Sequence, residues 1–171
     1  TEEICRCGKL GCLEAMAGGG AIGRDGAALA QAGRSPQLGK VLEEKGAVSA
    51  RDVSRAASMG DAAALELLQR SGRLLGQTLA GLVNFFNPSL ILIGGGVAGA
   101  GDPYLATVRE IVYARSAPLA TRDLVVQLSR LGHRAGVTGA ASMVLDQLFS
   151  TEHLGRWIDK GRPAGMEIAA A

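Results

Sequence analysis

Three cysteines near the start of the chain have the types and spacing of a metal site. Cys5, Cys7 and Cys12 lie close together, and the glycines between them, Gly8 and Gly11, permit tight turns. Thiolates at such short spacing can converge on one soft cation, and tetrahedral zinc is the usual occupant. An odd number of cysteines in one short stretch favours metal over a disulfide framework. The spacing therefore suggests a zinc loop at residues 1–14.

The cysteine loop has no fourth ligand close to it in the sequence. A structural zinc site has four protein ligands. The chain contains no other cysteine, and its two histidines, His133 and His153, are far down the sequence. On these residues alone the site is incomplete.

The segment that holds the cysteines resembles the zinc signature of a known family. It reads Cys-Arg-Cys-Gly-Lys-Leu-Gly-Cys-Leu-Glu from position 5 to position 14. This is similar to the motif of the ROK family, which groups bacterial sugar kinases with sugar-sensing transcriptional regulators on an actin-like, hexokinase-like scaffold. The resemblance implies that the zinc ligands are Cys5, Cys7 and Cys12. It also implies that Glu14 hydrogen-bonds a sugar hydroxyl.

The resemblance also predicts which part of a family member this chain represents. The family's fourth zinc ligand, a histidine in a Glu-x-Gly-His segment, its catalytic aspartate and its first phosphate-binding loop all precede the cysteines. We therefore expect residues 1–159 to be the C-terminal lobe of a ROK protein, as the start at Thr1 rather than methionine also suggests. The expected fold class is α/β, the C-terminal half of an actin-like (ribonuclease H-like) ATPase or hexokinase-type fold. Without the upstream groups, we expect this chain alone to show no ATP-dependent sugar phosphorylation.

The composition bounds the class of protein. The chain has 171 residues, of which 47% are hydrophobic, and a formal net charge of +2. This is enough for one domain with a hydrophobic core. The arginines between positions 109 and 134 indicate a solvated helical face, so we expect DNA binding only through a domain outside this chain. No apolar run approaches the ~20 residues of a membrane span, and clustered thiols fit a reducing cytoplasm.

Helices are predicted throughout the first third of the chain. Their expected ranges are 12–17, 21–31, 36–45 and a further helix that begins after Ser49. Ser35 followed by Pro36 is a typical helix start, and Ser49 with Asp52 is a capping-box pattern. The three glycines at positions 18–20 are interpreted as a helix break, because no strand precedes them as a phosphate-binding loop would require.

The longest periodic segment runs from Asp61 to about Phe86. Its apolar residues recur every three or four positions, which predicts a helix with one buried face. The expected face comprises Leu65, Leu68, Gly72, Leu75, Leu79, Leu82 and Phe86. Small residues on this segment would let a neighbouring helix approach closely. A coiled-coil dimer is the alternative interpretation of the stripe, but we favour a single core helix because the repeat is short for a coiled coil.

Strands and helices alternate after this helix. Leu90–Ile93 has the length and composition of a strand buried on both faces, and Leu124–Leu128 predicts a second strand. We expect one helix capped by Asp102 between the two strands and another from about Gly136 after them, with its valines and leucines facing inward. This alternation favours a small parallel sheet flanked by helices.

Gly94, Gly95 and Gly96 follow the first predicted strand directly. Ligands of open α/β sheets gather beyond the carboxyl ends of the strands, where glycines let backbone amides approach a phosphate. A tight turn without a ligand is an equally good interpretation of these glycines alone. The segment from position 87 to position 97 resembles the nucleotide-side motif of ROK kinases, and positions 135–141 resemble the family's closing helix. The resemblance implies that residues 87–149 form the nucleotide side and that Gly94, Gly95 and Gly96 bind the nucleotide.

The resemblance leaves two functions open. The favoured one is the sugar-sensing body of a ROK transcriptional regulator, because a further helix is predicted at 150–158, as in many regulators of the family. The alternative is an ATP-dependent kinase of a hexose or N-acetylhexosamine, which the intact glycine turn favours. Structural zinc is expected in both, but ATP and Mg²⁺ only in the kinase. Expected partners are a sugar or sugar phosphate and a second copy in a homodimer or larger assembly. Residues 160–171 are expected to be a disordered tail.

Overall fold

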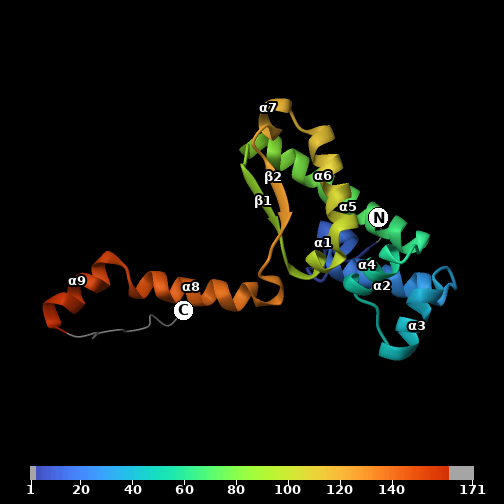
Figure 1. Cartoon of the computed structure of the whole chain (residues 1–171), viewed down its shortest axis with the longest axis horizontal. Coiled ribbons are helices and arrows are strands. Elements are labelled where there is room, and N and C mark those ends of the chain that lie inside the picture. Colours follow the sequence, from blue (N-terminus) through green and yellow to red (C-terminus); the bar gives the residue numbers. More distant parts are fainter. Residues whose placement is uncertain (1–2, 162–171) are drawn as a thin grey trace. The chain divides into compact units, whose positions relative to one another are not determined.

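The computed structural model describes residues 3–161, with side chains at all of these positions except 96 and 133. The chain divides into two compact units, residues 1–132 and 133–171, which are described separately (Figure 1). The first unit contains α1 (Leu13–Ala17), α2 (Gly19–Gln31), α3 (Pro36–Lys45), α4 (Ala50–Ser58), α5 (Ala62–Phe86), β1 (Leu90–Ile93), η1 (Gly95–Ala100), α6 (Gly101–Arg115), α7 (Pro118–Thr121) and β2 (Val125–Leu128). The second contains α8 (Ala135–Leu148) and α9 (Thr151–Lys160), and the short 3₁₀ turn η2 (Gly132–Arg134) lies at the boundary.

Side-chain caps begin α3 and α4 where the sequence predicts them, and Asp61 caps α5 as well. Ser35 Oγ accepts a hydrogen bond from the backbone N–H of Leu38 at 3.1 Å at the start of α3. Ser49 and Asp52 form a reciprocal capping box at the start of α4. These hydrogen bonds satisfy N–H groups that a helix leaves without intrahelical partners. The predicted helices of the first third are therefore confirmed, with two shifts: α1 begins at Leu13 instead of position 12, and α2 begins at Gly19 instead of position 21. Of the three glycines expected to break the helix, only Gly18 lies between α1 and α2.

Helices α5 and α6 pack side by side and run in the same direction. Gly72 lies beside Thr107, and Gly76 lies beside Ile111 one turn further along both helices. A Cβ atom added at Gly76 would stand 2.8 Å from the Ile111 Cβ, so only glycine allows this approach. The expectation that small residues bring a neighbouring helix close is confirmed.

The buried face of α5 differs from the predicted stripe. Leu68 and Gly72 are buried as expected, but Leu82 is 46% exposed and Phe86 is 67% exposed. The residues that are buried instead are Ala64, Leu67, Leu68, Ser71, Gly72, Gly76, Ala80 and Val83. A helix with leucines around much of its circumference buries the face on which its neighbour can come closest. On α5 this is the face with the glycines, so the prediction of the stripe was wrong at Leu65, which is 36% exposed, and at its C-terminal end.

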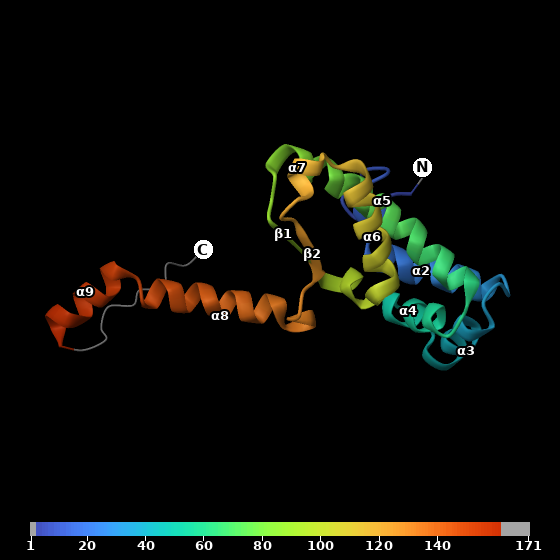
Figure 2. The same cartoon turned by 45° about the horizontal axis from the view of Figure 1, so that its top comes forward.

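Strands β1 and β2 form a two-stranded parallel sheet. Leu90 pairs with Val125 and Ile93 pairs with Leu128, and the strands lie along α6 (Figure 2). Val126 is buried in the core shared with α5 and α6, whereas Leu90 and Leu92 are exposed. The predicted parallel sheet is confirmed. The expected burial of β1 on both faces is wrong, because within residues 3–161 helices cover only one face of the sheet.

The connection from β1 into α6 also differs from its prediction. Asp102 was expected to cap α6, but the helix begins at Gly101, with no side-chain cap among the described residues. Gly101 has a φ of +70°, and a Cβ atom there would stand 2.8 Å from Ser54 Oγ. The 3₁₀ segment η1 therefore leads directly into α6 through a residue that must be glycine. Leu105 and Val108 on α6 are buried.

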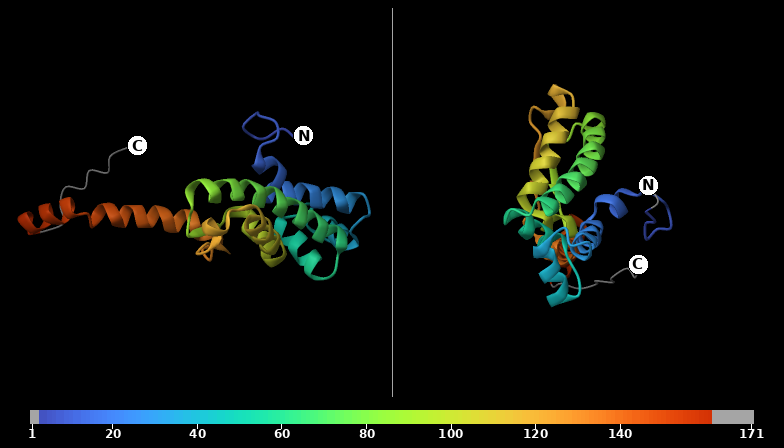
Figure 3. Two further views of the ribbon diagram at one scale, coloured as in Figure 1. Left: turned by 90° about the horizontal axis from the view of Figure 1, so that it is seen from above. Right: turned by 90° about the vertical axis from the view of Figure 1, so that its right-hand side faces the viewer.

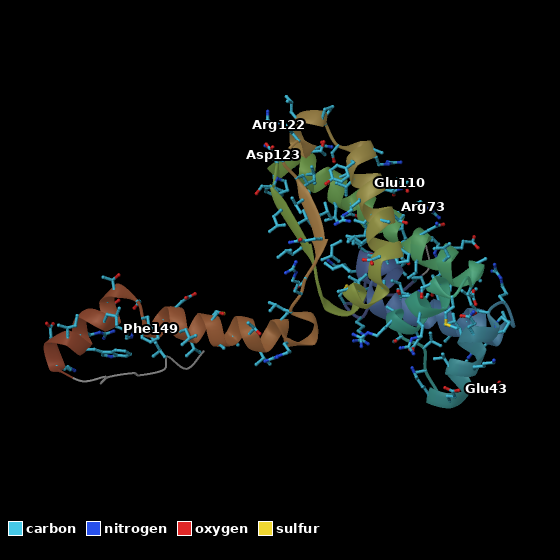
Figure 4. All side chains as sticks on the ribbon, viewed as in Figure 1. Glu43, Arg73, Glu110, Arg122, Asp123 and Phe149 are labelled. Atoms are coloured by element: carbon cyan, nitrogen blue, oxygen red, sulfur yellow. The ribbon has the colours of Figure 1, made fainter. Side chains whose placement is uncertain are left out.

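In the second unit, α8 was expected to bury an apolar face. Instead, within the described part of the chain none of its residues is buried, and Val137 is 77% exposed. The helix predicted at 150–158 is confirmed as α9, which Ser150 caps. Phe149, labelled between α8 and α9 in Figure 4, meets Trp157 edge to face with ring centroids 6.3 Å apart. The contact with α9 is too small to cover the α8 face. Of the predicted tail 160–171, Lys160 is the last residue of α9 and Gly161 is its C-cap, while positions 162–171 lie outside the described residues.

No helix in the range 3–161 combines the length and the apolar character that crossing a membrane requires.

Candidate functional site

The cysteine loop is a compact turn held by its own backbone. Ile4 and Leu10 form an antiparallel bridge, and the backbone N–H of Cys5 donates to Lys9 O at 2.8 Å. Gly8 has a φ of +81°, a conformation that other residues rarely adopt. Figure 3 shows the loop standing away from the helices of the first unit, joined to them through α1. The loop geometry therefore depends on its glycines and on its hydrogen bonds more than on burial.

The three thiols converge on one point. Their sulfur atoms all lie within 4.8 Å of one another, and the Cys7 and Cys12 sulfurs are 3.6 Å apart. Sulfur ligands at ~2.3 Å from a tetrahedral zinc ion stand roughly 3.8 Å apart, so the donor set fits zinc. Cys12 is also the residue directly before α1. A metal held here would fix the start of that helix.

Cys7 and Cys12 differ in acidity because of the hydrogen bonds that each thiol makes. A hydrogen bond from the Lys9 backbone, followed by those with Cys12 and Cys5, lowers the pKa of Cys7. The hydrogen bond with Cys7 raises the pKa of Cys12 to about 11. Cys7 therefore becomes a thiolate, the form that binds a metal, more readily than Cys12 does.

Arg24 on α2 ties both ends of the loop to the helices. Its guanidinium donates to Ala15 O at 3.2 Å and pairs with the Glu3 carboxylate at 3.0 Å. It also pairs with Asp25, which in turn pairs with Arg70 on α5. These ion pairs are partly exposed, so each contributes little to stability. Their position, before Cys5 and after Cys12, restricts how far the loop can move.

Glu14 lies between two pockets of the first unit. One, of about 440 Å³, includes Cys5 and Arg24 in its lining. The other, of about 590 Å³, is lined by Glu14, the glycines at 18–20, and Gly94 and Gly95 at the end of β1. A Cβ atom added at Gly18 would stand 2.6 Å from the Glu14 Cδ, so the absence of a side chain there makes room for the carboxylate. The structure thus brings the predicted sugar contact and the predicted nucleotide turn to one pocket.

The glycine turn occupies the carboxyl end of β1, where the sequence predicts it. Gly94 is extended, and Gly95 has a φ of +72°. Gly96 continues into η1, but its surroundings lie outside the described side chains. No side chain at positions 94 and 95 stands between the backbone and the pocket. The turn can therefore offer backbone N–H groups to an anionic ligand.

Tyr104 is a pocket residue that the sequence analysis missed. It lies on α6, is fully buried and lines the same 590 Å³ pocket. Burial, followed by the charge of Glu14, raises its pKa. The signal that could have revealed it is a tyrosine among the inward-facing positions of α6, because a buried hydroxyl needs a partner.

The fold and this pocket define a class of protein. Solved structures similar to this chain are ROK proteins, which have the actin-like sugar-kinase fold. The sequence model of the ROK family matches residues 1–147. The chain therefore belongs to the ROK family.

The relatives of this chain include both kinases and regulators. A glucokinase of Halalkalibacterium halodurans is 35% identical over 148 residues, which are 86% of this chain and 45% of that protein. The DNA-binding transcriptional dual regulator NagC of Escherichia coli is 31% identical over 142 residues, which are 83% of this chain and 34% of that protein. The chain spans about half the length or less of these relatives.

Solved structures divide in the same way. A ROK family transcriptional regulator, a homologue of the Escherichia coli MLC protein, has a TM-score of 0.67 at 35% identity and is matched over 82% of this chain and 35% of its own. A ROK glucokinase from Streptomyces griseus, in complex with glucose and AMPPNP, has a TM-score of 0.64 at 29% identity and is matched over 82% of this chain and 46% of its own. The likeness establishes the family without separating the two roles.

Proposed function

We propose that this chain is the sugar-sensing body of a ROK transcriptional regulator, with Glu14 as acceptor of a hydrogen bond from a sugar hydroxyl. The observation that carries the proposal is the position of the Glu14 carboxylate on a 590 Å³ pocket between α1, α5, α6 and the β1 turn. An ionised carboxylate only accepts hydrogen bonds, which suits a ligand rich in hydroxyl groups. The helix α9 beyond the family match and the likeness to a ROK regulator support the regulatory role.

The cysteine loop has a supporting role in this proposal. Cys5, Cys7 and Cys12 would hold zinc, which supplies a fixed crosslink between the two sides of the loop. Because Cys12 directly precedes α1 and Glu14 lies in the first turn of that helix, the loop sets the place of the carboxylate. A bound sugar then shifts a conformational equilibrium in a homodimer whose DNA-binding part lies outside this chain. The sugar acts only through its different affinities for the two conformations.

A second candidate is an ATP-dependent sugar kinase, and a specific observation favours it. Gly94 and Gly95 line the same pocket as Glu14, so a phosphate held by their backbone N–H groups would face a sugar held by Glu14. The glucokinase that resembles this chain was solved with both a sugar and a nucleotide analogue. In this case Mg²⁺-ATP would bind at Gly94, Gly95 and Gly96. Catalysis would rest on positioning and charge neutralisation, with a general base outside this chain.

The sugar site is tested by substitution of Glu14. In the protein expressed from its complete gene, binding of D-glucose, N-acetyl-D-glucosamine and D-xylose is measured by calorimetry. Glu14→Ala should lower the affinity for the sugar that binds by roughly 10- to 100-fold, because a hydrogen bond to a charged group is lost. Glu43→Ala is the matched control, since Glu43 is an exposed acid on α3 (Figure 4). Equal affinities for the two variants would overturn the proposed site.

Two assays on the same protein distinguish the regulator from the kinase. ADP release is followed in a coupled assay with each sugar, and binding to the DNA upstream of its own gene is followed by fluorescence anisotropy. Release from DNA by sugar, without sugar-dependent ADP release, supports the regulator. Sugar-dependent ADP release supports the kinase instead.

A further inference from the structure

The hydroxyl group of Tyr104 is buried without a hydrogen-bond partner among the described residues. The whole Tyr104 side chain is fully buried. A buried hydroxyl without a partner destabilises the folded state. Phenylalanine would fill the same space without this cost. The hydroxyl therefore points to a partner that it meets in another state of the site.

The pocket offers one acceptor of suitable charge. Among the described residues that line it, the only acid is Glu14, and the remainder are glycines and apolar side chains such as Leu75 and Val97. The Glu14 side chain is exposed and lies against Gly18, where it has room to turn. Tyr104 is held by the packing of α6 against α5. Of the two groups, the carboxylate is the one that can move.

We propose that Tyr104 is a positioning residue of the sugar site, whose hydroxyl donates to one Glu14 carboxylate oxygen and holds the other oxygen for the ligand. A carboxylate has two oxygens and can accept from both sides at once. In the described conformation the Tyr104 hydroxyl is closed to solvent and has no partner among the described residues. The bond forms when the Glu14 side chain turns from Gly18 toward the pocket. This inference rests on the proposed sugar site and assigns a further residue to it.

A double-mutant cycle tests the proposal in the protein expressed from its complete gene. The probe is the sugar among D-glucose, N-acetyl-D-glucosamine and D-xylose that binds most tightly. Tyr104→Phe should lower the affinity for this sugar about tenfold when Glu14 is present. In the Glu14→Ala background the same substitution should change the affinity by less than about twofold, because the group that it positions is gone. A packing role would lower the affinity by the same factor in both backgrounds, and that result would overturn the proposal.

Stability measurements provide a second readout. Without sugar, Tyr104→Phe should leave the melting temperature unchanged or raise it, because an unpaired hydroxyl is removed. With saturating sugar, the gain in melting temperature should be smaller for the variant than for the wild type. Tyr113→Phe is the matched control on the same helix. Its hydroxyl donates to Leu124 O at 2.8 Å, so its loss should lower stability without changing sugar affinity.

The outcomes separate this inference from the proposed function. If Glu14→Ala weakens sugar binding but Tyr104→Phe does not, the sugar site stands and the role of Tyr104 is wrong. If neither substitution changes the affinity, or if the wild type binds none of the three sugars, both proposals are wrong. If Tyr104→Phe weakens binding only in the presence of Glu14, the positioning role is supported.

Discussion

The helical body and the cysteine loop of the first unit are stabilised in different ways. The body, α2 to α6, buries side chains such as Ile22, Leu68 and Val108 completely. In the loop, by contrast, Ile4 is 71% exposed and Leu10 is 64% exposed. The loop is held by hydrogen bonds, by left-handed glycines and by three converging thiols. The body can therefore specify its own structure through burial, whereas a metal bound by the three thiols would add a crosslink to the loop.

The largest expected change in stability comes from truncating a buried side chain of the helical body. Leu68→Ala should lower the free energy of unfolding by about 3 kcal/mol, because Leu68 is fully buried on α5. Leu65→Ala on the same helix is the control, and it should cost less than about 1 kcal/mol because Leu65 is 36% exposed. Urea denaturation measures both. Zinc content of the folded Leu68→Ala protein should be unchanged, and a loss of zinc would contradict the independence of the two regions.

This pair of leucines also shows what the sequence could and could not predict. The period of three and four located α5 correctly, but it placed both Leu65 and Leu68 on the buried face, whereas only Leu68 is buried. The period could not show which part of a broad apolar surface is buried, because that depends on how closely α6 approaches over Gly72 and Gly76. The sequence likewise could not show that Leu92 on β1 stays exposed, because the residues of a strand do not indicate which elements pack against each of its faces.

The candidate site was predictable where chemistry requires particular residue types at fixed spacing. The cysteines converge as their spacing suggested, and the glycine turn follows β1. Tyr104 was not predictable in the same way, because it is close to Glu14 only in the folded structure. The proposed hydrogen bond between Tyr104 and Glu14 depends on the packing of α1 and α6 around one pocket, and the sequence of neither helix alone indicates that packing.

The second prediction concerns the loop. Cys7→Ser should weaken zinc binding about a hundredfold or more, since a soft thiolate is replaced by a neutral hydroxyl. Competition with a chromophoric chelator measures the affinity. The free energy of unfolding of the body should change by less than about 0.5 kcal/mol, because Cys7 is exposed. Lys9→Ala, within the same loop but without a ligand atom for zinc, is the control and should retain the metal. Unchanged zinc affinity in Cys7→Ser would remove this thiol from the site.

The smallest expected effect is a difference in how the two regions respond to acid. Burial raises the pKa of Asp52, but hydrogen bonds from Lys45 and Ser49 outweigh it and lower the pKa to about 2 from an ordinary value of 3.8. A carboxylate whose pKa is lower in the folded state stabilises the fold above its unfolded pKa. This contribution is lost as pH falls from about 4 to 2. Because the pairing with Lys45 is partly exposed, we expect it to amount to about 1 kcal/mol.

The acid response can be assigned to Asp52 by comparing two substitutions. Asp52→Asn removes the titrating group, so the free energy of unfolding should depend less on pH between about 4 and 2 than in the wild type. Asp123→Asn makes the same chemical change on an exposed carboxylate near α7 and should leave the wild-type dependence in place (Figure 4). Zinc should leave the loop at a higher pH than this window, because protons compete directly for its thiolates. Loss of zinc and loss of body stability over one and the same pH range would mean that the loop and the helices unfold as a single unit.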